Sequence, residues 1–273
     1  MMMKRLAQAG TFLAVFSSAG LAAADPGELV GIPVDTQGNN YGYWEYLPAA
    51  YDEESEPWPV MLFLSGIGEN GNGELPPGGC SGPNHTGEYL CRNLRHGPQS
   101  ILWNQLNEGG PEIWDDEERP FVILSPQNPA PLFNYVAYDA DDLDAFIAYV
   151  IDNYNVDPRR MYLTGMSMGG YSTLLNITAY PDRYAAAAVM PGINVGPAFA
   201  CNITPMNLWA FHGEDDGGQF NPLGMATFVN GFANCDGPHP TPRYTLYQDA
   251  GHNVWTRTID PAQGMDDPVA ETA

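Results

Sequence analysis

Basic residues are scarce in this sequence of 273 residues. Ten Lys and Arg stand against 33 Asp and Glu, which leaves a formal net charge of −23 at pH 7. A surface this acidic repels the phosphates of nucleic acids and the headgroups of anionic lipids. We therefore expect no nucleic-acid partner and no attachment to a membrane by charge. The net charge indicates which partners the surface repels, and it does not indicate a reaction.

Metal-binding patterns and long apolar segments are missing as well. No Cys-x-x-Cys pair suggests a zinc site, and His85 and His96 have no ligand spacing. The acidic cluster at residues 115–118 lacks the glycine-containing spacing of an EF-hand and is interpreted as a solvated loop. Beyond the N-terminal segment, no apolar run approaches the roughly 20 residues that span a bilayer. We expect no metal and no cofactor.

The first 24 residues have the pattern of an export signal. Lys4 and Arg5 precede an apolar stretch, and three alanines at 22–24 provide the small residues that signal peptidase requires. The apolar stretch is too short to cross a membrane. We therefore predict a signal peptide at residues 1–24, a mature chain that starts near Asp25, and a secreted protein, either extracellular or periplasmic.

Four cysteines remain in the mature chain: Cys80, Cys91, Cys201 and Cys235. An even number in an exported protein suggests two disulfides, and the sequence alone leaves three connectivities open. We favour Cys80 with Cys91, because both lie in one polar stretch rich in Gly and Pro that has the composition of a loop insertion. Cys201 with Cys235 then follows by elimination.

The length and the 44% of hydrophobic residues suit one sizeable core rather than two. We predict a single domain over residues 25–273, with a polar tail, a candidate for disorder, from about residue 262. Residues 139–158 have apolar positions at helical spacing and aspartates at their start, which predicts an amphipathic helix. Short apolar runs that end in Gly, Pro or Ser read as strands buried on both faces, at 60–66, 121–126, 160–165, 185–192 and 207–213.

This alternation of strands and helices predicts the α/β class, with a mostly parallel central sheet flanked by helices on both faces. The stretch "YLTGMSMGGYST" lies directly after one of the strands. Its G-x-S-x-G pattern places Ser167 between Gly165 and Gly169, followed by a segment that has the character of a helix. A strand that turns sharply into a helix at such a pattern exposes the serine hydroxyl as a nucleophile. Ser167 is therefore the candidate nucleophile.

A serine hydroxyl needs a base and an acid, which follow it in the order acid, then histidine, in this arrangement. His252 directly follows an apolar strand, whereas His239 lies between prolines, so we predict His252 as the base. The acid should follow the strand at 207–213, in "GEDDGGQF". Glu214, Asp215 and Asp216 all compete there, and spacing does not separate them.

The chain resembles the α/β-hydrolase superfamily, and within it the secreted esterases described as predicted peptidases and as polyhydroxybutyrate-depolymerase-like or phospholipase/carboxylesterase-like enzymes. The resemblance runs from residue 41 to residue 258 and so covers nearly all of the mature domain. It rests on these stretches, in the family's order: "YGYWEYLPAAY", "FLSGIGENGNG", "GPQSIL", "FVILSPQNP", "YLTGMSMGGYST", "YPDRYAAAAVMPG", "LWAFHGEDD" and "GHNVWTRT".

The resemblance implies that the acid is Asp216, four residues after His212, and that His212 is a structural residue of the turn. It also implies an oxyanion hole made by the backbone N–H groups of Ile67 and Met168. The chain departs from the family at Ser65, where a histidine is usual. It departs again after residue 260, where the family adds a helix and this chain continues in a short polar segment.

The implied reaction is acyl transfer to water from an ester that is either a small molecule or a polymer. We predict a serine esterase that acts on short-acyl esters or on an exposed polymeric ester, as a monomer. The alternatives are a polyester depolymerase, a feruloyl or acetyl polysaccharide esterase, a serine peptidase, and a catalytically silent protein that binds a ligand. Trp255 is either a substrate contact or a core tryptophan that closes the final strand.

Overall fold

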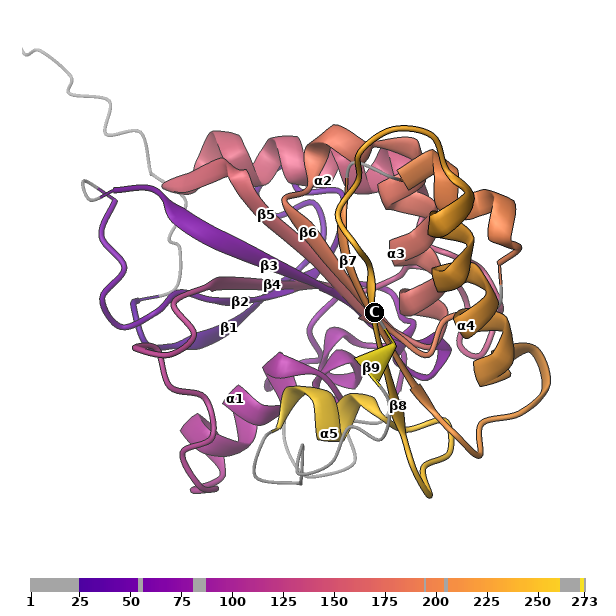
Figure 1. Ribbon diagram of the computed structural model, residues 1–273. Helices are drawn as coiled ribbons and strands as arrows, with labels where there is room; N and C mark the ends of the chain where they lie inside the picture. Colours follow the sequence, from indigo (N-terminus) through magenta and orange to yellow (C-terminus); the bar gives the residue numbers. More distant parts are fainter. Residues whose placement is uncertain are drawn as a thin grey trace, which may run out of the picture.

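Strands and helices alternate along the chain and assemble into a layered α/β structure (Figure 1). A computed structural model describes residues 25–53, 56–80, 87–193, 195–203, 206–260 and 271–272. The predicted signal peptide at residues 1–24 lies outside these residues, as do His85 and most of the predicted polar tail.

The strands of the described residues form one sheet in the order β1-β2-β4-β3-β5-β6-β7-β8-β9. All neighbours from β4 to β8 are parallel, whereas β1, β2 and β9 pair antiparallel at the two edges. The strands are β1 (Leu29–Ile32), β2 (Tyr43–Tyr46), β3 (Trp58–Leu64), β4 (Val122–Pro126), β5 (Val156–Met166), β6 (Ala186–Met190), β7 (Asn207–Gly213), β8 (Arg243–Tyr247) and β9 (Glu271–Thr272).

Helices cover both faces of this sheet, as Figure 1 shows. In that view α2, α3 and α4 lie on one side of the strands, and α1 and α5 lie on the other. The helices are α1 (Pro98–Asn107), α2 (Ala140–Asn153), α3 (Met168–Ala179), α4 (Pro222–Gly231) and α5 (Trp255–Ile259). None of these helices is long and apolar enough to span a bilayer, a finding that applies to the described residues.

The predicted fold class is confirmed, and the helix predicted over 139–158 is observed at 140–153, with the residues from Val156 on in β5. The carboxylate of Asp139 caps α2 by accepting hydrogen bonds from the N–H groups of Asp141 and Asp142, at 3.0 and 3.1 Å. The apolar positions Leu143 and Phe146 are fully buried under the sheet. The aspartates thus stabilise the N-terminal end of the helix, which carries the positive end of its dipole, and burial of the apolar stripe holds the helix against the core.

Some strand residues are not apolar, and the apolar pattern therefore does not predict them as strands. Strand β2 contains Glu45, which is fully buried and accepts a short hydrogen bond from the hydroxyl of Tyr154. In the centre of the sheet, strand β5 begins at Val156, earlier than the expected start at residue 160. Its first half includes the exposed Pro158 and Arg159, so the apolar pattern does not extend to the true start. Tertiary partners therefore stabilise strand residues that their own sequence does not mark as apolar.

The four cysteines form two disulfides in the favoured pairing. Cys80 bonds to Cys91, with a Cα–Cα distance of 5.4 Å, and Cys201 bonds to Cys235, with a Cα–Cα distance of 5.2 Å. The first ties the polar insertion to the 3₁₀ helix η2 (Leu90–Arg95), and the second ties η4 (Pro197–Ile203) to the end of η6 (Phe232–Asn234). Both disulfides therefore brace connections at the periphery of the sheet.

Helix α5 begins at Trp255, so this residue starts a short helix and does not close a strand. The polar segment expected in place of a family helix falls mostly on residues 261–270, which lie outside the described residues, so that expectation stays a prediction. Directly after residues 261–270, which the structure does not describe, β9 pairs with Tyr244 and Thr245 of β8.

Candidate active site

The turn between β5 and α3 places Ser167 in a strained backbone conformation, with φ 55° and ψ −120°. A side chain at Gly165 would meet the carbonyl oxygen of Gly169 at 2.4 Å, and one at Gly169 would meet the carbonyl oxygen of Leu64 at 2.0 Å. Strand and helix approach so closely that only glycine fits at both positions. Strain of this kind is concentrated at functional sites, and it is the geometry expected of a nucleophile elbow.

Three predicted residues meet at the carboxyl ends of the parallel strands. Ser167 follows β5, Asp216 follows β7 and His252 follows β8. The hydroxyl of Ser167 lies 2.9 Å from Nε2 of His252, and Nδ1 of His252 lies 2.8 Å from Oδ2 of Asp216. Because a carboxylate can only accept, Nδ1 carries the proton and Nε2 is free to accept from the serine. This alignment is that of a nucleophile, a base and an orienting acid.

The geometry distinguishes between the three acidic candidates. The side chain of Asp216 is only 5% exposed, and its Oδ1 accepts a hydrogen bond of 2.9 Å from the N–H of Gly217. Glu214 and Asp215 are exposed. His239 is likewise separate from the three aligned residues, with its Nδ1 near the carbonyl of Pro240. Of the three acidic candidates, Asp216 is the one within hydrogen-bond distance of His252.

His212, expected to be a structural residue of the turn, also contacts the acid Asp216. Its side chain is fully buried, and Nε2 lies 3.3 Å from Oδ2 of Asp216 and makes a short hydrogen bond with the carbonyl of Phe220. Both partners are acceptors, so Nε2 carries the proton. Burial lowers the pKa of His212 below its ordinary value of 6.5, which keeps the ring neutral. The sequence pattern does not reveal this bond.

Two aromatic rings enclose the imidazole of His252. The ring of Phe220 lies 4.3 Å from it, centre to centre, and the ring of Trp255 stands edge-on at 5.3 Å. Trp255 is 8% exposed and packs with Phe63 and Phe211 in one core cluster. The core interpretation therefore accounts for most of this side chain, and a substrate contact at its edge stays a prediction.

The two expected oxyanion donors belong to the two segments that adjoin the serine. A side chain at Gly66 would meet Cβ of Ser167 at 3.3 Å, so the turn after β3 lies directly against the nucleophile. Ile67 is the first residue of the 3₁₀ helix η1 (Ile67–Glu69), and Met168 is the first residue of α3. The N–H groups at the start of a helix have no acceptor within that helix, so both can point to a substrate oxygen.

Neighbouring segments hold the turn after β3. The carbonyl of Ile67 accepts a hydrogen bond of 3.1 Å from the N–H of Phe133. Nε of Arg92 donates to the carbonyl of Gly68. Glu69, also buried, pairs with Nδ1 of His96 at 2.9 Å. The turn is thus anchored by the segment after β4 and by the segment that directly follows Cys91.

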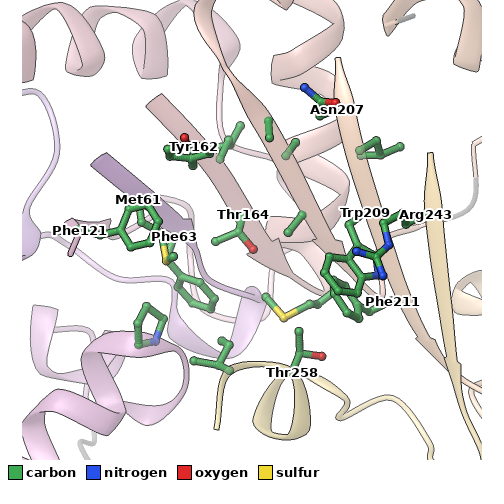
Figure 2. Close-up of a pocket in the computed structure, with 18 of the residues that line it drawn as sticks. Met61, Phe63, Phe121, Tyr162, Thr164, Asn207, Trp209, Phe211, Arg243 and Thr258 are labelled. Atoms are coloured by element: carbon green, nitrogen blue, oxygen red, sulfur yellow. The ribbon is translucent and has the colours of Figure 1, made fainter. Parts of the chain in front are cut away.

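Two cavities lie beside this site. An apolar cavity of about 450 Å³ opens over the sheet, and Figure 2 shows Met61, Phe63 and Trp209 among its walls. None of the three aligned residues lines it. A more polar cavity of about 600 Å³ is lined by His96 and Trp255 and therefore begins next to the base. Among the described residues, no group of three or more His, Cys, Asp or Glu could hold a metal.

Comparison with known proteins finds similarity to proteins named as hydrolases. The profile of the prolyl oligopeptidase family matches residues 133–202, which contain α2, β5, the elbow and β6. An acetylxylan esterase of Coprinopsis cinerea is 31% identical over 96 residues, which is 35% of this chain and 23% of that protein. A feruloyl esterase B of Neurospora crassa is 29% identical over 132 residues, which is 46% of this chain and 43% of that protein. The match therefore spans less than half the length of either relative.

A solved structure described as a thermostable esterase superposes with a TM-score of 0.56. It is 23% identical, and the superposition covers 86% of this chain and 57% of that one. Together with the strand order and the elbow, this likeness confirms the α/β-hydrolase fold that the sequence motifs suggest. A fold hosts many activities, so the reaction has to be argued from the site.

Proposed function

We propose that this chain, which has the α/β-hydrolase fold, is a serine carboxylic-ester hydrolase. The observation that carries the proposal is the continuous line of hydrogen bonds from Ser167 through His252 to Asp216, at 2.9 and 2.8 Å. The relatives named as esterases support the same reaction class.

In the proposed first step, Ser167 attacks the carbonyl carbon of the ester. A bond forms between its Oγ and that carbon while Nε2 of His252 takes the hydroxyl proton. Asp216 holds the imidazole in the tautomer that can accept this proton, and it stabilises the imidazolium that results. His252 then donates the proton to the departing alcohol as the carbon–oxygen bond breaks, which leaves an acyl-enzyme on Ser167.

Negative charge develops on the former carbonyl oxygen in this step. The N–H groups of Ile67 and Met168 are the proposed donors, and each such donor typically lowers the barrier by about 3 kcal/mol. A water molecule then repeats the sequence: His252 takes its proton, and the hydroxide attacks the acyl carbon. The acid product leaves when Oγ of Ser167 regains the proton.

The proposed substrates are short-acyl esters or esters on an exposed polymer. The side chain of His252 is 34% exposed, so an ester can reach the base from solvent. The apolar cavity is not lined by the three aligned residues and therefore offers no wall for a long acyl chain at the serine. Because relatives are named acetylxylan esterase and feruloyl esterase, we favour a polysaccharide that carries acetyl or feruloyl esters as the polymer substrate.

Peptide hydrolysis is the second candidate, since the matching profile is that of the prolyl oligopeptidase family. Its match covers residues 133–202, which contain the nucleophile and neither the acid nor the base. We therefore place ester hydrolysis first and expect slow cleavage of peptides at best.

A substrate panel tests the proposal. Kinetic constants (kcat/KM) would be measured for p-nitrophenyl acetate, butyrate, laurate and palmitate, for acetylated xylan, methyl ferulate and polyhydroxybutyrate, and for a peptide anilide. We expect acetate and butyrate to be hydrolysed fastest, with release of acetate or ferulate from the plant-type substrates. Ser167→Ala should abolish both hydrolysis and labelling by a fluorophosphonate probe. Labelling that survives Ser167→Ala, or a peptide cleaved faster than its matched ester, would contradict the proposal.

Export is proposed together with the activity. The two disulfides favour an oxidising compartment, and the predicted signal at residues 1–24 would direct the chain there. N-terminal sequencing of the secreted protein should find a start near Asp25. A secreted form that retains Lys4 would contradict a cleaved signal.

A further inference from the structure

The oxyanion turn departs from the usual family pattern at Ser65, and the structure shows what holds the turn instead. Ser65 is 1% exposed, directly before the glycine that lies against Ser167. Its hydroxyl is 3.1 Å from the hydroxyl of Tyr138, and its N–H donates to the same phenol oxygen at 3.3 Å. Tyr138 comes from the segment before α2, 73 positions along the chain.

The hydrogen bonds of the Tyr138 hydroxyl use its full capacity. A phenol has one proton to donate and two lone pairs with which to accept. The proton goes to the carbonyl of Pro126, at the end of β4, over 2.9 Å. The lone pairs then accept from the N–H and the hydroxyl of Ser65. Burial raises the pKa of Tyr138 to about 12, so the phenol keeps its proton wherever the enzyme would work.

The backbone of Tyr138 reaches the other side of the site. Its N–H donates to Oγ of Ser172 over 3.0 Å, and Oγ of Ser172 donates to the carbonyl of Met168 over 2.8 Å. Tyr138 and Ser172 are both buried, at 2% and 0% exposure, so water does not compete for these bonds. One residue is therefore linked to the turn that carries Ile67 and to the first turn of α3, which begins with Met168.

We propose that Tyr138 is a positioning residue for the oxyanion hole. The phenol fixes the turn after β3 relative to β4, and the backbone of the same residue fixes the start of α3. The spacing between the N–H groups of Ile67 and Met168 then depends on Tyr138. This inference rests on the proposed esterase activity, because those N–H groups matter only if an oxyanion forms between them.

The physical reason for the proposal is the preorganisation of the two oxyanion donors. Oxyanion donors stabilise the transition state most when they are already aimed at the developing charge, and a misdirected donor loses much of that effect. Without the phenol, the N–H and hydroxyl of Ser65 and the carbonyl of Pro126 lose a buried partner. The turn is then expected to shift so as to satisfy these groups, and the N–H of Ile67 shifts with it.

The test compares Tyr138→Phe with Tyr184→Phe, both of which remove one buried hydroxyl. The Tyr184 hydroxyl has no hydrogen-bond partner among the described residues, and Tyr184 lies at the opposite end of the sheet, before β6. Esterase kcat and KM on p-nitrophenyl acetate would be measured per active site, counted by complete fluorophosphonate incorporation. The inhibition constant of a trifluoromethyl ketone, which forms a tetrahedral oxyanion on the serine, would be measured alongside.

For Tyr138→Phe we expect kcat to fall roughly 10-fold or more with KM changed less than about threefold, by the logic of a displaced oxyanion donor. The ketone should bind more weakly by a similar factor. Tyr184→Phe should stay within twofold of the parent in both measurements. A purely structural role would lower the melting temperature of Tyr138→Phe and leave kcat per site and ketone binding unchanged, which would overturn the proposal.

Ser65→Ala keeps the test decisive if Tyr138→Phe does not fold. It removes one of the bonds to the phenol, so a smaller loss of kcat is expected, and an activity equal to that of the parent would count against the proposal. In the double variant, Ser65→Ala should add little to Tyr138→Phe, because both act through the same hydroxyl. Absence of ester hydrolysis in the parent enzyme would contradict the proposed function itself, a result that is separate from all of these.

Discussion

Nε2 of His212 lies 3.3 Å from Oδ2 of Asp216, the same carboxylate oxygen that accepts from His252. The His212 ring also bonds to the carbonyl of Phe220, whose own ring packs on His252. One buried imidazole at the end of β7 therefore holds both the acid and the loop that covers the base. Its bonds limit the positions that Asp216 can adopt.

Removing the donor at His212 should impair the acid without removing it. For His212→Leu we expect kcat to fall roughly 10-fold, since the carboxylate of Asp216 would lose the N–H that lies 3.3 Å from it, and polar contacts to charged groups contribute about 1.5–3 kcal/mol when they are good hydrogen bonds. His212→Gln keeps a neutral N–H donor and should recover most of the rate. Ester hydrolysis per titrated active site measures both, and equal rates for the two variants would show that the bond to Asp216 does not matter for catalysis.

The buried His212 also predicts how stability depends on pH. Its pKa is lowered in the folded state by burial, so the unfolded chain binds the proton more readily as the pH falls. The contribution of His212 is fully present above the ordinary pKa of 6.5 and is lost progressively below it. The melting temperature should therefore decrease from pH 7 to pH 5, and His212→Gln should show a weaker decrease. A parallel decrease in both proteins would assign the effect to other groups.

The choice of the acid is open to direct measurement. Asp216→Asn should lower kcat by about 10⁴, as expected when the orienting carboxylate of such a triad is lost. Asp215→Asn is the matched control, since that neighbour is exposed and the change is identical. We expect the control to stay within about twofold of the parent, because exposed substitutions away from a site have small effects. A large loss in Asp215→Asn with a small one in Asp216→Asn would reverse the assignment.

The two disulfides should differ in how much they stabilise the fold. Cys201 and Cys235 are 34 residues apart, and Cys80 and Cys91 are 11 apart. On the chain-entropy relation, the longer loop corresponds to about 4 kcal/mol and the shorter to about 3 kcal/mol. Urea unfolding of the paired Cys→Ser variants should show the larger loss for Cys201→Ser/Cys235→Ser. The reverse order would mean that native-state contacts outweigh loop entropy.

Local sequence patterns predict those elements of the protein whose structure depends mainly on residues close together in the chain. The strand at 207–213 is observed with the same bounds, because a continuous apolar run must be buried on both faces. The elbow at Ser167 is readable because glycine spacing reports directly on how closely strand and helix approach. The class of fold follows from the order of such segments.

Tertiary structure alone decides the contacts between residues that are far apart in the chain. Asp215 and Asp216 are adjacent and chemically identical, and only the direction of the loop after β7 brings one of them to His252. Strand β2 is stabilised at Glu45 by a tyrosine more than a hundred residues away. Ser65 has no visible partner in its own segment, and Tyr138 reaches it only because β3, β4 and α3 pack together. Periodicity records which face of an element is buried, and it carries no information on which distant polar group lies opposite a given side chain.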